Sequence, residues 1–348
     1  MTDFFIRVKR QLEQQLPFVI YSKPADSRLV GLFQQNDHLY FSENLSESGF
    51  VMAPFFEGSK ILMPNNESEE IIVAVSFKAE EMPTANRTET GSDADTSFVN
   101  LVSKAVDAIE NGQFSKVVLS RSEKVSIENF DAVAIFERLA RMYQDAFTYC
   151  WFHPKVGMWL GATPELLVQN EGSTYRSVAL AGTRTYNGTT DIKWENKEQD
   201  EQQFVTDYII ESLRGISSEI VVSSPYTARA GNLNHIKSDV EVVVKEGVEL
   251  STVVTALHPT PAVCGVPKQQ AVEFILNNED YQREFYSGYL GELNIDDKTE
   301  LFVNLRCMKV VDGAATLFVG AGITKDSDPY SEYIETANKS MTLKRILK

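Results

Sequence analysis

Near its C-terminus the chain reads Leu317-Phe318-Val319-Gly320-Ala321-Gly322-Ile323, followed by Ser327-Asp328-Pro329 and a polar helical pattern. The first run predicts an apolar strand that leads into a glycine turn, and such a turn can point backbone N–H groups at an anion. Asp328 and Pro329 are favoured at the N-cap and at the first position of a helix. This segment therefore predicts a strand, a turn and a helix in succession.

The helix that begins there carries charge on its apolar face. Glu332, Glu335 and Lys339 share one side, and at about 100° per residue this side continues into Leu343 and Ile346. Charges that face a core are costly unless they are paired or bound to a metal. A solvated Glu335–Lys339 pair, four residues apart, explains the same pattern.

A second predicted helix, over residues 196–214, repeats this arrangement. Glu198 and Glu201 fall in the middle of its apolar stripe, which consists of Phe204, Val205, Tyr208, Ile209 and Leu213. An acidic first turn that is favoured by the helix dipole is the alternative interpretation. Carboxylates that converge from two helices would suit a hard cation, Mg²⁺ above all.

Composition limits the class of protein. The 348 residues are 43% hydrophobic and 24% charged, which is typical of a globular protein with an ample core. We find neither an apolar run of about 18 residues nor a secretory signal. Cys150, Cys264 and Cys307 lie in apolar contexts, so we expect buried free thiols and a cytoplasmic location. The net charge of −16, without a block of Lys or Arg, argues against nucleic-acid binding.

Runs of long antiparallel strands with helices between the runs indicate an α+β fold. Short apolar or alternating runs over residues 17–77 predict an antiparallel meander, and residues 80–95 read as a linker. We therefore assign residues 1–95 to an N-terminal, mainly β-meander part plus linker. Further predictions are helices over 96–111, 131–144, 231–244 and 268–276, and one long strand over 299–311.

Three single residues are candidates for chemistry. Lys116 opens a strand; it is either an edge residue or, if desolvated, a general base. Glu165 follows the turn Gly161–Pro164, which suits a positioned acid but also an ordinary strand end. Arg306 is predicted inside an apolar strand, where a substrate carboxylate would be a good partner.

Seven segments, taken in order, resemble the chorismate-utilising enzymes, a family that includes isochorismate, salicylate, anthranilate and aminodeoxychorismate synthases. The segments are 114–121, 161–166, 181–184, 258–265, 305–306, 320–323 and 327–339. The resemblance covers about residues 96–348, which we expect to be the chorismate-binding catalytic region. It implies two antiparallel sheets packed as a sandwich with helices on the outside.

The resemblance also implies a site. Glu201 and Glu332 would bind Mg²⁺, supported by Glu198 and Glu335, and the metal would hold the ring carboxylate of chorismate. Lys116 would be the base and Glu165 the acid. The residues implied to bind the substrate are Gly182, Thr183, His235, His258, Ala262, Tyr286, Arg306, Gly320, Gly322 and Lys339.

Four positions indicate which member of the family this chain resembles. Water-using members carry Lys at the position of Lys116, whereas anthranilate synthases carry Gln. Ala181 stands where aminodeoxychorismate synthases have Lys, Ala262 stands where pyruvate-eliminating members have Thr, and the loop 258–261 is typical of isochorismate synthases. Gln202 departs from the family's usual His and puts the surroundings of the metal in doubt.

These positions predict an isochorismate synthase that adds water at C2 of chorismate and removes the C4 hydroxyl. The alternatives are a salicylate synthase, which would go on to eliminate pyruvate, and a non-catalytic homologue that binds a metal or a metabolite. We expect a monomer without an amidotransferase subunit and with no nucleic-acid or membrane partner. Its product would feed either menaquinone or siderophore synthesis.

Overall fold

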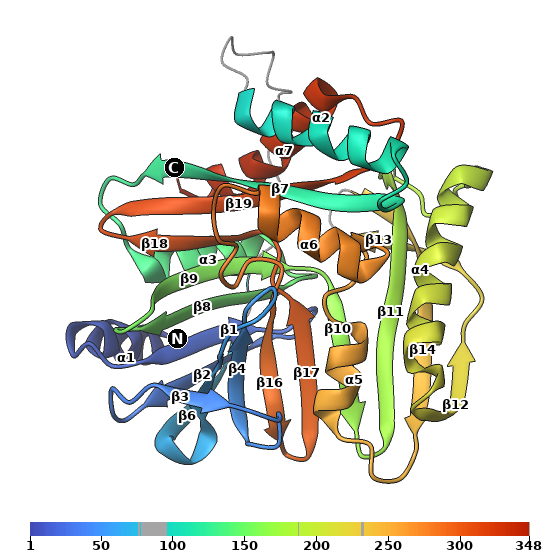
Figure 1. The fold of residues 1–348 in the computed structure, drawn as a ribbon. Coiled ribbons are helices and arrows are strands. Elements are labelled where there is room, and N and C mark those ends of the chain that lie inside the picture. Colours follow the sequence, from blue (N-terminus) through green and yellow to red (C-terminus); the bar gives the residue numbers. More distant parts are fainter. Residues whose placement is uncertain (76, 78–95, 187, 231–232, 348) are drawn as a thin grey trace.

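The computed structural model describes residues 1–75, 77, 96–186, 188–230 and 233–347. Within these residues the strands form two antiparallel sheets, and the strands of one sheet run across those of the other in Figure 1. Helices lie on the outer sides of both sheets. The predicted α+β sandwich with external helices is confirmed, and the chain changes sheet several times along its length.

The first sheet has nine strands among the described residues. Their order is β15 (Gly265–Val266), β7 (Lys116–Ser126), β19 (Ala314–Ile323), β18 (Cys307–Val311), β9 (Gly157–Thr163), β8 (Phe147–His153), β1 (Phe18–Ser22), β2 (Arg28–Gln34) and β6 (Ser68–Ala74). In β8 all seven residues are buried, because α3 covers one face of this strand and the second sheet covers the other.

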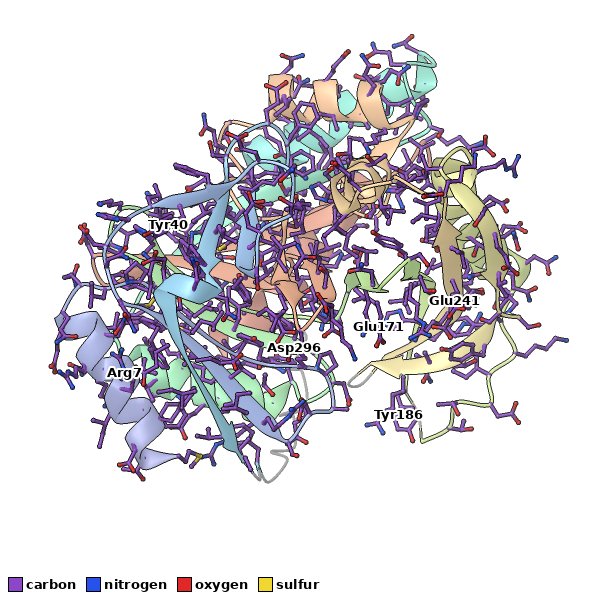
Figure 2. All side chains as sticks on the ribbon, turned by 90° about the horizontal axis from the view of Figure 1, so that it is seen from below. Arg7, Tyr40, Glu171, Tyr186, Glu241 and Asp296 are labelled. Atoms are coloured by element: carbon purple, nitrogen blue, oxygen red, sulfur yellow. The ribbon has the colours of Figure 1, made fainter. Side chains whose placement is uncertain are left out.

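The second sheet is larger. Its order is β12 (Ser217–Val222), β14 (Leu233–Val244), β11 (Thr174–Thr185), β10 (Leu166–Glu171), β17 (Lys298–Val303), β16 (Tyr289–Ile295), β4 (Gly49–Ala53), β5 (Lys60–Pro64) and β3 (Tyr40–Ser42), with β13 (Tyr226–Ala230) paired to β14. Figure 2 shows Glu171 and Glu241 on this sheet and Tyr186 on the segment that follows β11.

The described helices are α1 (Thr2–Glu13), α2 (Thr96–Glu110), α3 (Ala132–Met142), α4 (Asn196–Arg214), α5 (Leu250–Leu257), α6 (Lys268–Asn278) and α7 (Pro329–Lys344), with a 3₁₀ turn at Asn65–Glu67. In Figure 1, α2 and α7 lie together beyond β7 and β19, whereas α4 lies along β11 and β14. No helix in the described part of the chain is long and apolar enough to cross a membrane.

Aromatic side chains fill the space between the sheets. Trp151, Trp159 and Tyr149 of the nine-stranded sheet are fully buried there. The ring of Phe147 stacks on Phe302 of the other sheet at a centroid distance of 4.5 Å. Each such ring buries a large apolar area and adds a preferred ring geometry, so this layer fixes the spacing of the two sheets. The three cysteines are buried free thiols, as predicted.

The helix predicted over residues 231–244 is wrong. Strand β14 occupies 233–244, and the residues just before it, 231–232, lie outside the described part. Ile236, Val240 and Val244 recur every four residues, which mimics a helix. The buried side chains in fact alternate, because Ser238 and Val242 face inward as well, and the polar Ser238 concealed the two-residue period.

The single strand predicted over 299–311 is also wrong. The chain leaves the ten-stranded sheet at the end of β17 and enters the nine-stranded sheet at the start of β18. Arg306 therefore lies in the connection between the sheets, with a positive φ of 48°. The N-terminal strands are likewise divided, with β1, β2 and β6 in one sheet and β3, β4 and β5 in the other.

Candidate active site

Two sheet crossings lie against each other and bring Glu165 next to Arg306. Residues 164–165 connect β9 of one sheet to β10 of the other, and residues 304–306 make the return crossing. The amide of Val303 donates to the carbonyl of Glu165 at 2.9 Å, and the amide of Ala162 donates to the carbonyl of Arg306 at 3.2 Å. The fold thus fixes both backbones where the sheets meet.

The carboxyl of Glu165 has an unusual pKa. Burial raises the pKa of Glu165 to about 7, although the positive charges of Lys116 and Arg306 act in the opposite direction. A carboxyl that stays protonated near neutral pH suits a general acid. The influence of both cations also shows that Lys116 and Arg306 share the surroundings of Glu165.

Arg306 is a partly buried cation at this crossing. Burial lowers its pKa, while Tyr143 and Glu165 act to raise it. Its charge also contributes to the lowered pKa of His235, after the larger effect of burial. A desolvated guanidinium at the meeting point of two sheets is a strong candidate to bind a carboxylate.

Two glycines of β19 make room for the catalytic candidates. Gly320 and Gly322 are two residues apart in the strand and therefore face the same side. A Cβ on Gly322 would lie 3.3 Å from Cε of Lys116, and a Cβ on Gly320 would lie 3.0 Å from the hydroxyl of Tyr286. The strand predicted at 317–323 thus brings Lys116 and Tyr286 to one surface, and Nζ of Lys339 reaches the carbonyl of Gly320 at 3.0 Å.

Gly182 and His235 lie on neighbouring strands of the second sheet. Nδ1 of His235 is 2.9 Å from the carbonyl oxygen of Gly182 and donates to it. Gly182 has a φ of +67°, and a Cβ there would lie 3.1 Å from Cβ of Glu198 on α4. These three residues are therefore together. The backbone of Thr183 lies in β11, but its side chain is outside the described part of the structure.

The loop after α5 presents Ala262 outward and His258 inward. Nε2 of His258 donates to the carbonyl of Phe55 at 3.0 Å, and burial lowers the pKa of His258 to about 4. Ala262 is exposed. It lines a small pocket of about 30 Å³ together with Glu165 and with residues of β10, β11 and α4. The loop thus places Ala262 next to the acid candidate, and His258 supports the loop from beneath.

The predicted buried face of α4 is displaced. The residues buried against the sheet are Gln202, Thr206, Ile209 and Leu213, whereas Phe204 is 45% exposed. The centre of this buried face is rotated about the helix axis by about 70° from Val205, which lies at the centre of the predicted face. Glu201 is therefore exposed and Glu198 is half-buried. Gln202, at the position where the resemblance implies His, donates to Ser238 and Thr206 at 3.0 Å each. Two polar residues thus occupy positions that an apolar pattern could not predict.

The same correction applies to α7. Its buried residues are Thr336, Ser340 and Leu343, and Glu332 lies one turn before them on this face. Glu335 and Lys339 are about half exposed and pair at 2.6 Å, which confirms the alternative interpretation of this pair. Burial, together with the charge of Glu335, raises the pKa of Glu332, whose carboxylate accepts from Ser327 at 2.7 Å.

The four glutamates do not form a metal site as they stand. Oxygen-rich carboxylates suit Mg²⁺ chemically. Glu198, however, is bound by Arg184 at 2.8 Å, and Glu335 is bound by Lys339. Among the described residues, no three His, Cys, Asp or Glu side chains lie close enough together to hold a cation. The carboxylate donors suit the ion chemically, but these two ion pairs would first have to open, and no chemical step below is routed through the ion.

Sequence reasoning missed a buried network behind the site. Arg283 and Glu279 form an ion pair whose side chains are only 3% and 2% exposed. Asn304 is fully buried at the second crossing and accepts from the hydroxyl of Tyr149 at 2.7 Å. The spacing Glu279-x-x-x-Arg283 was the available signal, but it is indistinguishable from an ordinary surface pair in the sequence.

The sequence profile of the family described as "Chorismate binding enzyme" matches residues 58–348. This chain belongs to that family. Among its relatives, isochorismate synthase EntC of Escherichia coli (strain K12) is 33% identical over 260 residues, covering 71% of this chain and 66% of EntC.

Other relatives widen the range of activities. The isochorismate synthase MenF of the same strain is 28% identical over 261 residues, 72% of this chain and 60% of MenF. Anthranilate synthase component 1 of Methanothermobacter thermautotrophicus is also 28% identical, over 71% of this chain and 55% of that protein. The matched regions thus span roughly half to two thirds of these relatives.

Solved structures show that the fold is shared along nearly the whole chain. The structure of MenF from Escherichia coli superposes with a TM-score of 0.79 at 22% identity, over 95% of this chain and 89% of that one. The isochorismate synthase DhbC of Bacillus anthracis gives a TM-score of 0.77 at 23% identity, over 97% and 99%. At this identity the likeness describes the fold alone.

Proposed function

We propose that this chain is an isochorismate synthase, which converts chorismate to isochorismate by adding water at C2 and releasing the C4 hydroxyl. The observation that carries the proposal is the position of Glu165. Its pKa of about 7 provides an acid at neutral pH, and the cations Lys116 and Arg306 act on it from the same surroundings. The similarity to named isochorismate synthases supports the same reaction.

In this proposal the chain's own residues divide the chemistry. The ammonium of Lys116 first loses a proton to solvent, and Nζ of the neutral amine then accepts a proton from the water that attacks C2. The carboxyl of Glu165 gives its proton to the departing C4 oxygen, and the ring double bonds shift between the two carbons. Arg306 and the hydroxyl of Tyr286 bind the enolpyruvyl carboxylate, so that water and acid are held at opposite ends of the displacement. No oxidation or reduction occurs.

Two residues favour this reaction over those of the other family members. Anthranilate synthases are also among the relatives, but Lys116 provides a base where those enzymes are expected to carry Gln. Ala262 contributes only a methyl group to the pocket that it shares with Glu165, where a Thr at the same position would add a hydroxyl that could assist pyruvate loss. We therefore propose that isochorismate leaves before elimination.

The test is to incubate the protein with chorismate and Mg²⁺ and to separate the products by chromatography, with pyruvate followed in parallel. We expect isochorismate and little pyruvate. Lys116→Ala should lower kcat by roughly 10²–10⁴, whereas Lys124→Ala, at an exposed position of the same strand, should not change it. Stoichiometric pyruvate would identify a salicylate synthase, and no turnover would favour a binding protein.

We also propose that turnover depends on Mg²⁺, with oxygens from Glu201 and Glu332 supported by Glu198 and Glu335. Such an ion supplies charge that neutralises a substrate carboxylate. The raised pKa of Glu332 supports the proposal, since a cation beside this half-buried group would relieve the repulsion from Glu335. Ligation would require Glu198 to leave Arg184 and Glu335 to leave Lys339.

Removal of the metal tests this dependence. EDTA should abolish turnover and added Mg²⁺ should restore it, and Glu201→Gln or Glu332→Gln should each lower activity at least about 100-fold. Mg²⁺ should also raise the melting temperature of the unmodified protein but not of these variants. Glu211→Gln on α4, whose side chain is 72% exposed, is the control. Full activity in chelator would refute the metal proposal.

A further inference from the structure

Arg283 joins two segments that flank the candidate site. Its guanidinium donates to the carbonyl of Val118 at 2.7 Å and to the carbonyl of Val263 at 2.9 Å. Val118 lies two residues after Lys116 on β7, and Val263 follows Ala262 directly. One planar group thus fixes the distance between the strand of the proposed base and the loop that borders the acid.

Glu279 completes this connection. Its carboxylate accepts from Nε and Nη2 of Arg283 at 2.8 and 2.5 Å, and from the amide and hydroxyl of Ser120 at 2.8 and 2.9 Å. Ser120 lies on β7 in register with Gly320. We call Glu279 and Arg283 together the Arg283 clamp. The clamp holds β7 at Val118 and at Ser120, which are two residues apart in the strand.

The clamp is also continuous with the proposed anion-binding residues. The amide of Tyr286 donates to the carbonyl of Arg283 at 2.9 Å, and Nδ2 of Asn304 donates to the carbonyl of Phe285 at 2.9 Å. Asn304 is two residues from Arg306. Hydrogen bonds thus connect the clamp to Tyr286 and to the sheet crossing of Arg306.

A buried ion pair of this kind usually adds little net stability, because desolvation offsets the attraction. The ion pair instead supplies a fixed geometry, because a guanidinium directs its N–H groups in one plane. We propose that the Arg283 clamp is a positioning element for the reaction, which sets where Lys116 and the Ala262 loop lie relative to Glu165. This inference rests on the proposed function. The clamp itself contacts no reacting atom.

The test is Arg283→Lys, which keeps the charge but cannot span two carbonyls and a carboxylate. Because a displacement of about 1 Å can cost about 10²-fold in rate, we expect kcat to fall by about this factor. The Kd for chorismate, measured by calorimetry, should change less than about threefold, because Arg306 and Tyr286 remain. The double variant Glu279→Gln/Arg283→Met leaves no unpaired buried charge and should show the same loss of kcat. If the single variant misfolds, the double variant still tests the proposal.

Val8→Ala is the control for lost stability. Val8 of α1 is fully buried in the separate cluster that includes residues of α3, and this variant should melt earlier without losing kcat. The proposal is overturned if both clamp variants keep kcat within about threefold, or if Val8→Ala loses kcat as much at an equal melting temperature. The rate is followed as chorismate consumption, whereas product identity is measured separately on the unmodified protein, so a failure of the proposed function is recognised independently.

Discussion

At the scale of single residues, the site depends on where the backbone crosses between the sheets. The sequence placed Glu165 after a constrained turn, and the structure shows why that turn exists: the chain changes sheets there. Arg306 was identified as a buried cation but assigned to a strand interior. Its left-handed φ of 48° belongs to a non-glycine residue in a connection, and no periodicity in the apolar run 301–311 signals that break.

The variant Glu165→Gln should remove both the destabilisation that the buried carboxylate causes and the proposed proton donor, and the two effects can be measured separately. The pKa of Glu165 is raised in the folded protein from 4.5 to about 7. Below a pH of about 4.5 the carboxyl is protonated in both the folded and the unfolded state, so it does not change the stability. Between pH values of about 4.5 and 7 the ionised carboxylate increasingly destabilises the folded protein. Above a pH of about 7 this destabilisation is complete at no more than about 3 kcal/mol, and partial exposure of the side chain reduces it. Gln should therefore stabilise the protein at pH 8 but not at pH 4.

The same variant should lower kcat by roughly 10²–10⁴, and the fall in kcat of the unmodified enzyme above pH of about 7 should disappear. Urea unfolding at both pH values and a kcat profile provide the measurements. Glu171→Gln, at the far end of β10 with a 70% exposed side chain, is the control. Equal stability of the two proteins at pH 8 would show that Glu165 is not desolvated.

At the scale of elements, apolar strands and isolated amphipathic helices were predictable, whereas polar packing faces were not. The predicted helices at 96–111, 131–144 and 268–276 correspond closely to α2, α3 and α6. The faces of α4 and α7 were misplaced because Gln202, Thr206, Thr336 and Ser340 are buried. Thr336 accepts from Arg121 at 2.8 Å and Gln202 donates to Ser238 at 3.0 Å, and both partners come from distant parts of the chain. Thr206 and Ser340 donate to carbonyls one turn earlier in their own helices.

Strand β19 allows a prediction that compares its two glycines. A Cβ on Gly322 would meet the flexible end of Lys116, whereas a Cβ on Gly320 would lie 2.8 Å from the backbone carbonyl of Leu119. Gly322→Ala should therefore fold normally and lower kcat by moving Lys116, by about tenfold or more. Gly320→Ala should lower the melting temperature as well.

The measurements are circular dichroism melting curves and turnover of chorismate. Gly313→Ala is not a suitable control, since its φ of +76° adds strain. Ala315→Gly, in the same strand but distant from Lys116, tests for general weakening of β19 instead. Unchanged kcat in Gly322→Ala would mean that Lys116 does not need to lie over this glycine.

At the scale of the whole molecule, the resemblance to a family covered residues 96–348, but the sheets use strands from the entire chain. β1 lies between β8 and β2 in one sheet, and β4 pairs with β16 in the other. The order of strands could not be read from the sequence, because β1 and β4 each pair on one side with a strand more than a hundred residues away. Local patterns predict that a strand exists, whereas pairing depends on contacts across the whole chain.

A fragment comprising residues 96–348 should therefore not fold on its own. Without β1 and β4, strands β8 and β16 would each lose one of their two backbone partners. The layer between the sheets would lose Tyr21 and Phe50, whose rings contact Phe147 at 5.4 and 6.3 Å. We expect no cooperative unfolding transition for this fragment and no turnover of chorismate. Co-expression with residues 1–75 should restore both, because the missing strands would pair again. A fragment that melts cooperatively by itself would show that the catalytic region is an independent domain and that the N-terminal strands are accessory.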